Sequence, residues 1–330
     1  MAHRFWDNLS PSFPSRTRGS PSQQPYHVFS ESDQTWHAVQ PTWRRSATSD
    51  PELSSFTVLS WNIDFMRILP DERMRAALDH LRQHIYGNIS SEYESDADHK
   101  VIMLNEMTHS DLQIIQSQDW IQQEFQLTDI SSEYWESNVY GTCMLVPKSM
   151  AITDVFRVHY TQTDMSRDAL FVEVYLRGKN VRLCTTHLQS LVARPPLRPR
   201  QLAEAARHLH NADAGILGGD LNAIERFDRN LHTLNSLKDA YLETGQEEGS
   251  EAGMTWGQMA ATSSRERHGL TRMDKILYCG GVRLQGFGTF GMDVQVANES
   301  DRQSLIEEEG LEKGWVTDHL GVKANFLLVS

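Results

Sequence analysis

Two polar side chains, two residues apart, directly follow a short apolar run in this chain. The run covers residues 214–217, and the pair is Asp220 and Asn222. Such a run is typical of a buried strand, and side chains at positions i and i+2 of an extended segment point the same way. The carboxylate can therefore act as a base, and the amide as a donor, at one reacting centre. Gly-Asp-x-Asn is also common in turns, so this spacing alone leaves both interpretations open.

Several other apolar runs end in polar residues of matching chemistry. These residues are Asn62, Glu106, His187, Asp274, Asp318 and His319. Each one alone is explained by a strand that meets solvent where it ends. Together, the carboxylates suit a hard cation such as Mg²⁺, and the histidines and amides suit a phosphate group and the charge that builds on it. A carboxylate beside a histidine also fixes its tautomer. The set predicts metal-assisted attack of water on a phosphodiester.

The elements that must position these residues are mostly strands. Apolar runs predict strands over 56–64, 101–104, 140–146, 152–158, 169–176, 181–187, 214–217, 271–278, 282–290 and 320–328. Helices are expected over 73–85, 110–125, 200–210 and 234–242, and residues 299–312 form an acidic insert. Many strands with few helices indicate largely antiparallel sheets that pack together, with the helices outside.

The composition limits the partners of this protein. Phosphate affinity comes mainly from Lys and Arg, so a net charge of −13 argues against a general polyanion binder. Any nucleic-acid contact must be local, and arginines near the motifs can supply it: Arg194, Arg198, Arg200, Arg265, Arg267 and Arg272. The three cysteines lie in apolar runs and are expected to be buried thiols. The chain has no run of 18 apolar residues, so we expect no membrane span.

The first 50 residues differ from the rest of the chain. They are rich in Ser, Pro, Gln and Arg and lack apolar periodicity, which predicts a disordered tail ahead of a catalytic domain at 51–330. The tail lacks the apolar segment of a secretory signal, so we expect an intracellular protein, nuclear or cytoplasmic and not secreted. We also expect a monomer. Its Arg and Ser content leaves organelle targeting as an alternative, against which Asp7, Glu31 and Asp33 count.

Six motifs in order resemble one enzyme superfamily. They are Trp61-Asn62-Ile63-Asp64, Leu104-Asn105-Glu106, Thr186-His187-Leu188, Gly219-Asp220-Leu221-Asn222, Arg272-Met273-Asp274 and Thr317-Asp318-His319. The pattern is similar to the endonuclease/exonuclease/phosphatase superfamily, the DNase I-like enzymes. The resemblance implies an α+β fold, a four-layer α/β/β/α sandwich of two packed, mostly antiparallel sheets, with the site at one edge.

The resemblance also implies the catalytic roles. Glu106 would ligate Mg²⁺, for which Mn²⁺ can substitute, and Asn62 and Asp318 would help to hold the metal, its waters or the phosphate. Asp220 would activate water, which Asn222 orients. The remaining residues would grip the phosphate or support that grip: His187, Ser190 and His319 as contacts, and Asp274 as the partner of His319.

Within the superfamily, the chain most resembles the tyrosyl-DNA phosphodiesterase 2 branch. The additional features are His187-Leu188-Gln189-Ser190, Thr255-Trp256 and Ser166-Arg167 before a strand. This resemblance implies hydrolysis of a tyrosyl adduct on a DNA 5′ phosphate, with Arg167 stacked on Trp256 to form a groove wall. Tyr140 is expected to contact the substrate as well.

The chain departs from the usual motifs at a few positions. Asn105, Gln189 and Thr317 replace the usual Gln, Glu and Ser, and Met273 stands where an aromatic residue is expected. Every catalytic group is kept, which argues against an inactive scaffold. The same chemistry on RNA, abasic DNA, an inositol phosphate or a phospholipid head group remains an alternative.

Overall fold

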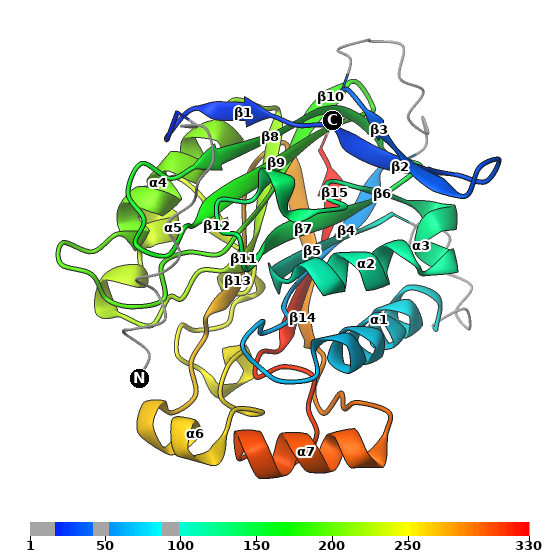
Figure 1. Cartoon of the computed structure of the whole chain (residues 1–330). Coiled ribbons are helices and arrows are strands. Elements are labelled where there is room, and N and C mark those ends of the chain that lie inside the picture. Colours follow the sequence, from blue (N-terminus) through cyan, green and yellow to red (C-terminus); the bar gives the residue numbers. More distant parts are fainter. Residues whose placement is uncertain (1–16, 42–52, 88–98, 330) are drawn as a thin grey trace.

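Two β-sheets pack face to face in the computed structural model, which describes residues 17–41, 53–87 and 99–329 (Figure 1). The eight-stranded sheet has the order β14-β15-β4-β5-β7-β6-β2-β3. Its strands are β14 (Val282–Phe290), β15 (Gly321–Leu328), β4 (Ser55–Asn62), β5 (Lys100–Met107), β7 (Gly141–Pro147), β6 (Phe125–Leu127), β2 (Tyr26–Ser30) and β3 (Thr35–Val39).

The seven-stranded sheet has the order β1-β8-β9-β10-β11-β13-β12. Its strands are β1 (Pro21–Gln23), β8 (Ala151–His159), β9 (Asp168–Leu176), β10 (Lys179–Thr186), β11 (Ala214–Asp220), β13 (Asp274–Gly280) and β12 (Lys238–Asp239). In the described part of the chain, β4 with β5 and β10 with β11 are parallel pairs, and the other paired strands are antiparallel. The expectation of mostly antiparallel sheets is confirmed.

Helices cover the outer faces of both sheets and complete the four layers (Figure 1). The α-helices are α1 (Pro70–Tyr86), α2 (His109–Gln116), α3 (Asp119–Glu124), α4 (Arg198–Leu209), α5 (Leu231–Leu234), α6 (Thr262–His268) and α7 (Glu299–Glu309). The single-turn 3₁₀ helices are Ser132–Tyr134, Arg226–Asp228, Leu242–Thr244 and Glu251–Gly253. Within the described residues, each helix is too short or too polar to cross a lipid bilayer.

The alternation of side chains along the strands explains the layers. Val58 of β4 lies in the apolar layer between the sheets, whereas Leu59 and Trp61 face the layer under α1. Successive side chains of a strand point to opposite faces, so a strand that is buried on both faces must be apolar at nearly every position. On the other side of the molecule, Leu202 and Ala205 of α4 pack on the outer face of the seven-stranded sheet. The predicted α/β/β/α sandwich is therefore confirmed.

Two helix predictions need correction. The helix expected over 110–125 is divided into α2 and α3, and the turn between them contains Ser117, whose hydroxyl donates to the carbonyl of Ile114. The helix expected over 234–242 is wrong, because α5 ends at Leu234 and residues 238–239 pair with β13. Apolar spacing over so few residues does not separate a short helix from a short strand.

The predicted disordered tail over 1–50 is wrong for residues 17–41. Strand β1 pairs with β8 of one sheet, and β2 pairs with β6 of the other. Between them, Gln24 is buried, donates to the Thr128 carbonyl and accepts from Arg157 Nε at 3.0 Å. These strands form because two sheet edges offer unpaired backbone N–H and C=O groups, which hydrogen-bond to the backbone of this segment. The segment can therefore form strands although its composition is polar. The rest of the predicted tail lies outside the described residues.

Candidate active site

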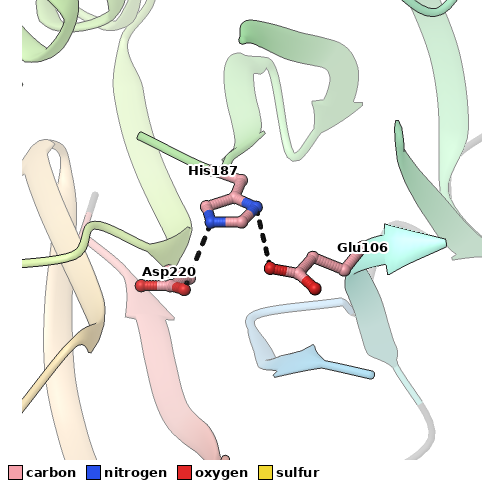
Figure 2. A group of neighbouring side chains, drawn as sticks. All are labelled: Glu106, His187 and Asp220. Atoms are coloured by element: carbon pink, nitrogen blue, oxygen red, sulfur yellow. Dashed lines mark ion pairs between the residues drawn. The ribbon is translucent and has the colours of Figure 1, made fainter. Parts of the chain in front are cut away.

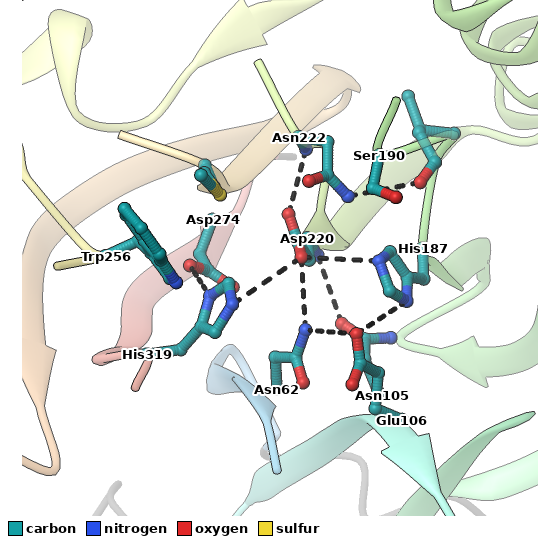
Figure 3. A network of polar contacts seen from close by, with 12 residues as sticks. Asn62, Asn105, Glu106, His187, Ser190, Asp220, Asn222, Trp256, Asp274 and His319 are labelled. Atoms are coloured by element: carbon teal, nitrogen blue, oxygen red, sulfur yellow. Dashed lines mark hydrogen bonds and ion pairs between the residues drawn. The ribbon is translucent and has the colours of Figure 1, made fainter. Parts of the chain in front are cut away.

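The strand topology gathers the predicted catalytic residues at one edge of the sandwich. The parallel pairs β4–β5 and β10–β11 end there, with Asn62 as the last residue of β4 and Asp220 as the last of β11. Their antiparallel neighbours β13 and β15 begin at the same edge, so Asp274 and His319 arrive from the opposite chain direction. Figure 3 shows these side chains pointing toward one another from different strands.

Asp220 is the buried centre of the polar network. Its Oδ2 lies 3.0 Å from Asn62 Nδ2 and 3.3 Å from His187 Nε2. Its Oδ1 accepts the backbone N–H of Asn222 at 2.8 Å. The carboxylate is therefore held by donors on both oxygens, an arrangement that fixes its orientation.

Glu106 lies on the other side of His187, and Figure 2 shows the imidazole between the two carboxylates. Glu106 Oε1 accepts from Asn62 Nδ2 at 3.2 Å, and Oε2 accepts from the backbone N–H of Phe65 at 3.1 Å. Burial, followed by the negative charge of Asp64, raises the pKa of Glu106 to about 7. A cation beside these carboxylates would reverse this effect, because it favours the ionised form.

The donor set fits a divalent metal ion. The carboxylates of Glu106 and Asp220 belong with His187 to one cluster, in which one nitrogen or oxygen atom of each residue lies within 4.8 Å of the others. Hard cations such as Mg²⁺ prefer carboxylate oxygens, so Glu106 is the residue best suited to hold the ion, with Asn62 hydrogen-bonded to it. Asp318, the third predicted metal residue, accepts from Trp256 Nε1 at 2.7 Å and lies beside His319 instead.

His319 is held as a cation by surrounding carboxylates. Its Nδ1 lies 2.8 Å from Asp274 Oδ2, which confirms the predicted pair, and its Nε2 lies 3.9 Å from Asp220 Oδ2. Burial alone would lower the pKa of His319, but the negative charges of Asp274, Asp220 and Asp318 outweigh it and raise this pKa well above its usual value. Burial raises the pKa of Asp274 to about 6 despite its imidazole partner. A protonated His319 can donate from Nε2 to a bound phosphate.

The backbone around the site adopts conformations that few residues take. Glu106 and Asn222 have positive φ angles of 59° and 47°. A Cβ on Gly219 would lie 1.9 Å from the Thr186 carbonyl oxygen, so β11 approaches the end of β10 closely just before Asp220. Positive φ at non-glycine residues costs of order 1–3 kcal/mol each and is concentrated at functional sites.

The four residues predicted to contact the substrate differ in their surroundings. The predicted stack of Arg167 on Trp256 is wrong: the guanidinium lies 4.9 Å from the centroid of the Tyr140 ring. Arg167 and Tyr140 are both buried, whereas Trp256 is half-buried and forms a backbone bridge with His319. Ser190 is partly exposed, and its hydroxyl donates to Met165 Sδ at 3.0 Å. Trp256 and Ser190 thus keep some exposed surface, whereas Arg167 is buried.

Two residues without a predicted role support the site. The Asn105 side chain accepts from the backbone N–H of Asp220 at 3.1 Å and donates to Thr185 Oγ1 at 3.0 Å, so it joins the two sheets beside the site. Thr255 Oγ1 accepts from the backbone N–H of Asp274 at 3.0 Å. The sequence offered one indication of this role for Asn105, which is a polar residue at the end of the apolar run 101–104.

The predicted track of exposed arginines is also wrong at key positions. Arg198 is buried in a two-pronged hydrogen bond with Asp228, and Arg272 is buried against Asp239 and Glu248. These guanidinium groups are neutralised inside the protein and are not available to a phosphate backbone. Sequence position near a motif did not reveal their partners.

The fold and the site define a class of enzyme. The chain matches the model of the Endonuclease/Exonuclease/phosphatase family over residues 59–319, and it belongs to this family. Members of the family hydrolyse phosphoric ester bonds, and the expectation drawn from the six motifs is confirmed.

Among individual relatives, a 5′-tyrosyl-DNA phosphodiesterase of Caenorhabditis elegans is 25% identical over 233 residues, which is 68% of this chain and 58% of that protein. The chain thus spans less than two thirds of the length of this relative. The structure of D. rerio TDP2 complexed with single strand DNA product has a TM-score of 0.60 and 18% identity, and the match covers 83% of this chain and 99% of that one. A mannosyl-6-phosphatase of Bacteroides thetaiotaomicron has a TM-score of 0.58 and 13% identity, over 83% and 100% of the two chains. Both structures show the shared fold.

Proposed function

We propose that this chain is a Mg²⁺-dependent phosphodiesterase that hydrolyses phosphotyrosyl adducts at DNA 5′ ends, with Mn²⁺ as a substitute ion. The observation that carries the chemistry is the Asp220 carboxylate, buried and held by Asn62, His187 and Asn222. The substrate class is supported by the curated relative, which is named for this activity. The proposed catalytic unit comprises residues 53–329 together with the strands of 17–41.

Asp220 is the proposed base. Its Oδ1 is committed to the Asn222 backbone, and its Oδ2 faces the side-chain donors of the site. A water molecule within hydrogen-bond reach of Oδ2 would transfer its proton there as it attacks phosphorus. The Asn222 side chain donates to the Leu188 carbonyl, so the amide that is proposed to orient the water is itself fixed.

The charge that builds on the phosphate would be stabilised by donors that the fold holds in place. His319, protonated through Asp274, is the proposed donor, and the amide of Asn62 holds the Glu106 and Asp220 carboxylates in place beside it. Donors that are positioned before the reaction do not have to reorganise as charge develops. A Mg²⁺ ion held at Glu106 would polarise the phosphoryl oxygen and offset its negative charge.

The surface near the site suits an adduct with apolar or aromatic groups. Leu191, next to Ser190, is 52% exposed, and Leu270 is 37% exposed. Leu270 lies against Gly257 in the loop that carries Trp256. Exposed apolar groups beside a polar centre often mark a ligand-binding surface, and a tyrosyl ring or an unpaired base presents a complementary face.

The direct test is hydrolysis of an oligonucleotide with a 5′-phosphotyrosyl end in the presence of Mg²⁺. We expect release of tyrosine and a 5′-phosphate end, and loss of both with Asp220→Asn. An oligonucleotide with a 3′-phosphotyrosyl end is the matched control for polarity. A folded protein that leaves the 5′ adduct intact would contradict the proposed substrate.

A small phosphate ester is the second candidate substrate. It is favoured by the net charge of −13 and by Arg198 and Arg272, whose ion pairs remove them from a DNA track. A panel of RNA, abasic DNA, inositol phosphates, sugar phosphates and phospholipid head groups would separate these substrates from the 5′ adduct. Turnover of one of them at a higher kcat/KM than the DNA adduct would replace the proposed substrate and keep the chemistry.

A further inference from the structure

The Arg167 guanidinium is packed between an aromatic ring and a catalytic histidine. It lies 4.9 Å from the Tyr140 ring centroid, and its Nη1 is 2.5 Å from His187 Nδ1. Phe65 stacks on the Tyr140 ring with a centroid distance of 4.4 Å, which places a further aromatic layer beside the arginine. Arg167 is only 3% exposed, so its guanidinium is held by these neighbours rather than by solvent.

The hydrogen bond between Arg167 and His187 can have one direction only. A guanidinium has N–H donors and no acceptor, and it stays protonated in proteins. His187 Nδ1 must therefore accept, which requires that this nitrogen carries no proton. The alternative, a proton on Nδ1 donated to Glu106, is disfavoured because the Glu106 oxygen is 3.6 Å away and the Arg167 donor is 2.5 Å away.

This direction determines the state of the opposite ring nitrogen. A neutral imidazole with a bare Nδ1 carries its proton on Nε2, and Nε2 lies 3.3 Å from Asp220 Oδ2. The ring can then donate to Asp220 or to a phosphate oxygen that approaches it. In the other tautomer, a lone pair on Nε2 would face the carboxylate and repel it.

We propose that Arg167 is a positioning residue, which holds His187 in the tautomer with its proton on Nε2. The catalytic consequence rests on the proposed function, whereas the tautomer itself does not.

The tautomer is measured without substrate or metal, by long-range ¹H–¹⁵N correlation spectra of the full chain. The His187 signals are assigned by their loss in His187→Gln. We expect an acceptor-type Nδ1 and a protonated Nε2 in the wild type, and a tautomer mixture in Arg167→Met. Arg167→Lys keeps a donor and should partly restore the wild-type pattern. Arg182→Met, in the strand that leads to His187 and paired with Glu173, is the control for loss of a partly buried arginine and should leave the pattern unchanged.

Kinetics on the preferred substrate separate positioning from binding. We expect kcat of Arg167→Met to fall about 10- to 100-fold, the usual cost of removing a residue that orients a catalytic ligand, with KM unchanged. A proton on Nδ1 in the wild type, or an unchanged tautomer in Arg167→Met, would overturn the proposal. A raised KM with unchanged kcat would do the same, because it marks a substrate contact. An absence of turnover on every substrate would count against the proposed function, and the spectra would still decide the tautomer.

Discussion

Asp220, the last residue of β11, is the direct cross-strand neighbour of Asp274, the first residue of β13. His319 links the two carboxylates, with Nδ1 2.8 Å from Asp274 and Nε2 3.9 Å from Asp220. Two buried carboxylates this close disfavour each other's ionised forms, and a cation shared between them offsets that effect. The pair therefore keeps His319 protonated, the state in which its Nε2 can donate to a phosphate oxygen in the proposed reaction.

Asp220→Asn is expected to lower kcat by about 10²- to 10⁴-fold, because the proposed base can no longer accept a proton. The melting temperature should stay unchanged or rise, since the substitution removes one of several clustered negative charges. The measurements are steady-state turnover and thermal unfolding. The matched control is Asp213→Asn, which changes an exposed carboxylate directly before the first residue of β11, at the far end of the strand from Asp220. This variant should retain the wild-type rate. A wild-type rate in Asp220→Asn would exclude this residue as the base.

Mg²⁺ is expected to raise the melting temperature more at pH 8 than at pH 6. Without metal, burial raises the pKa of Glu106 to about 7, so below this pH its carboxyl is mostly protonated and ligates poorly. As pH rises through about 7, the ionised form dominates and metal affinity increases. Thermal unfolding with and without Mg²⁺ measures the shift, and Glu106→Gln should abolish it. EDTA should stop turnover and added Mg²⁺ or Mn²⁺ should restore it; activity that survives EDTA would contradict metal dependence.

Gly219→Ala is expected to destabilise the protein by about 1–3 kcal/mol, the usual cost of forcing an added methyl group into a packed site. The new Cβ would lie 1.9 Å from the Thr186 carbonyl oxygen, so the strand ends must separate. Because Asp220 is the next residue, kcat should fall as well. Gly286→Ala is the matched control, since its Cβ would meet its nearest neighbour at 4.0 Å. Equal stability of the two variants in urea unfolding would argue against the close approach.

Arg272→Met is expected to lower the free energy of unfolding at pH 7 by about 3–5 kcal/mol, because it leaves a buried carboxylate without its main partner. Burial alone would raise the pKa of Asp239, but the Arg272 guanidinium outweighs burial and lowers it. The wild type therefore gains this stability above about pH 4, the unfolded pKa of Asp, and loses it as pH falls below that value.

In Arg272→Met the pKa of Asp239 should be raised instead, so acid should cost the variant less stability than it costs the wild type. Urea unfolding at pH 7 and pH 3 measures both effects. Arg265→Met, which removes a more exposed arginine paired with Glu312, is the control and should change stability little. The same loss on acidification in Arg272→Met and wild type would show that the ion pair does not determine acid stability.

The sequence by itself determined the family of the chain, the candidate site residues and most of the strands that carry them. Asn62, Glu106, Asp220 and His319 each end or precede an apolar run, and this is a local property that any strand shows in its own residues. The pairing of His319 with Asp274 followed from resemblance, and the structure confirms it. The sandwich also followed, because strands that are apolar on both faces must be covered on both faces.

Only the tertiary structure decided which partners the charged residues take. Tyr140 precedes a strand of one sheet and Arg167 precedes a strand of the other, so their contact exists only because the two sheets pack together. In the same way, Arg198 pairs with Asp228 and Arg272 pairs with Asp239. In both cases the two partners lie on different segments of the chain, and their spacing in the sequence does not indicate the contact. Residues 17–41 form strands because distant segments offer them sheet edges. A local pattern records which face of an element is buried, but the partner of a buried charge is set by long-range packing, which no short window of sequence contains.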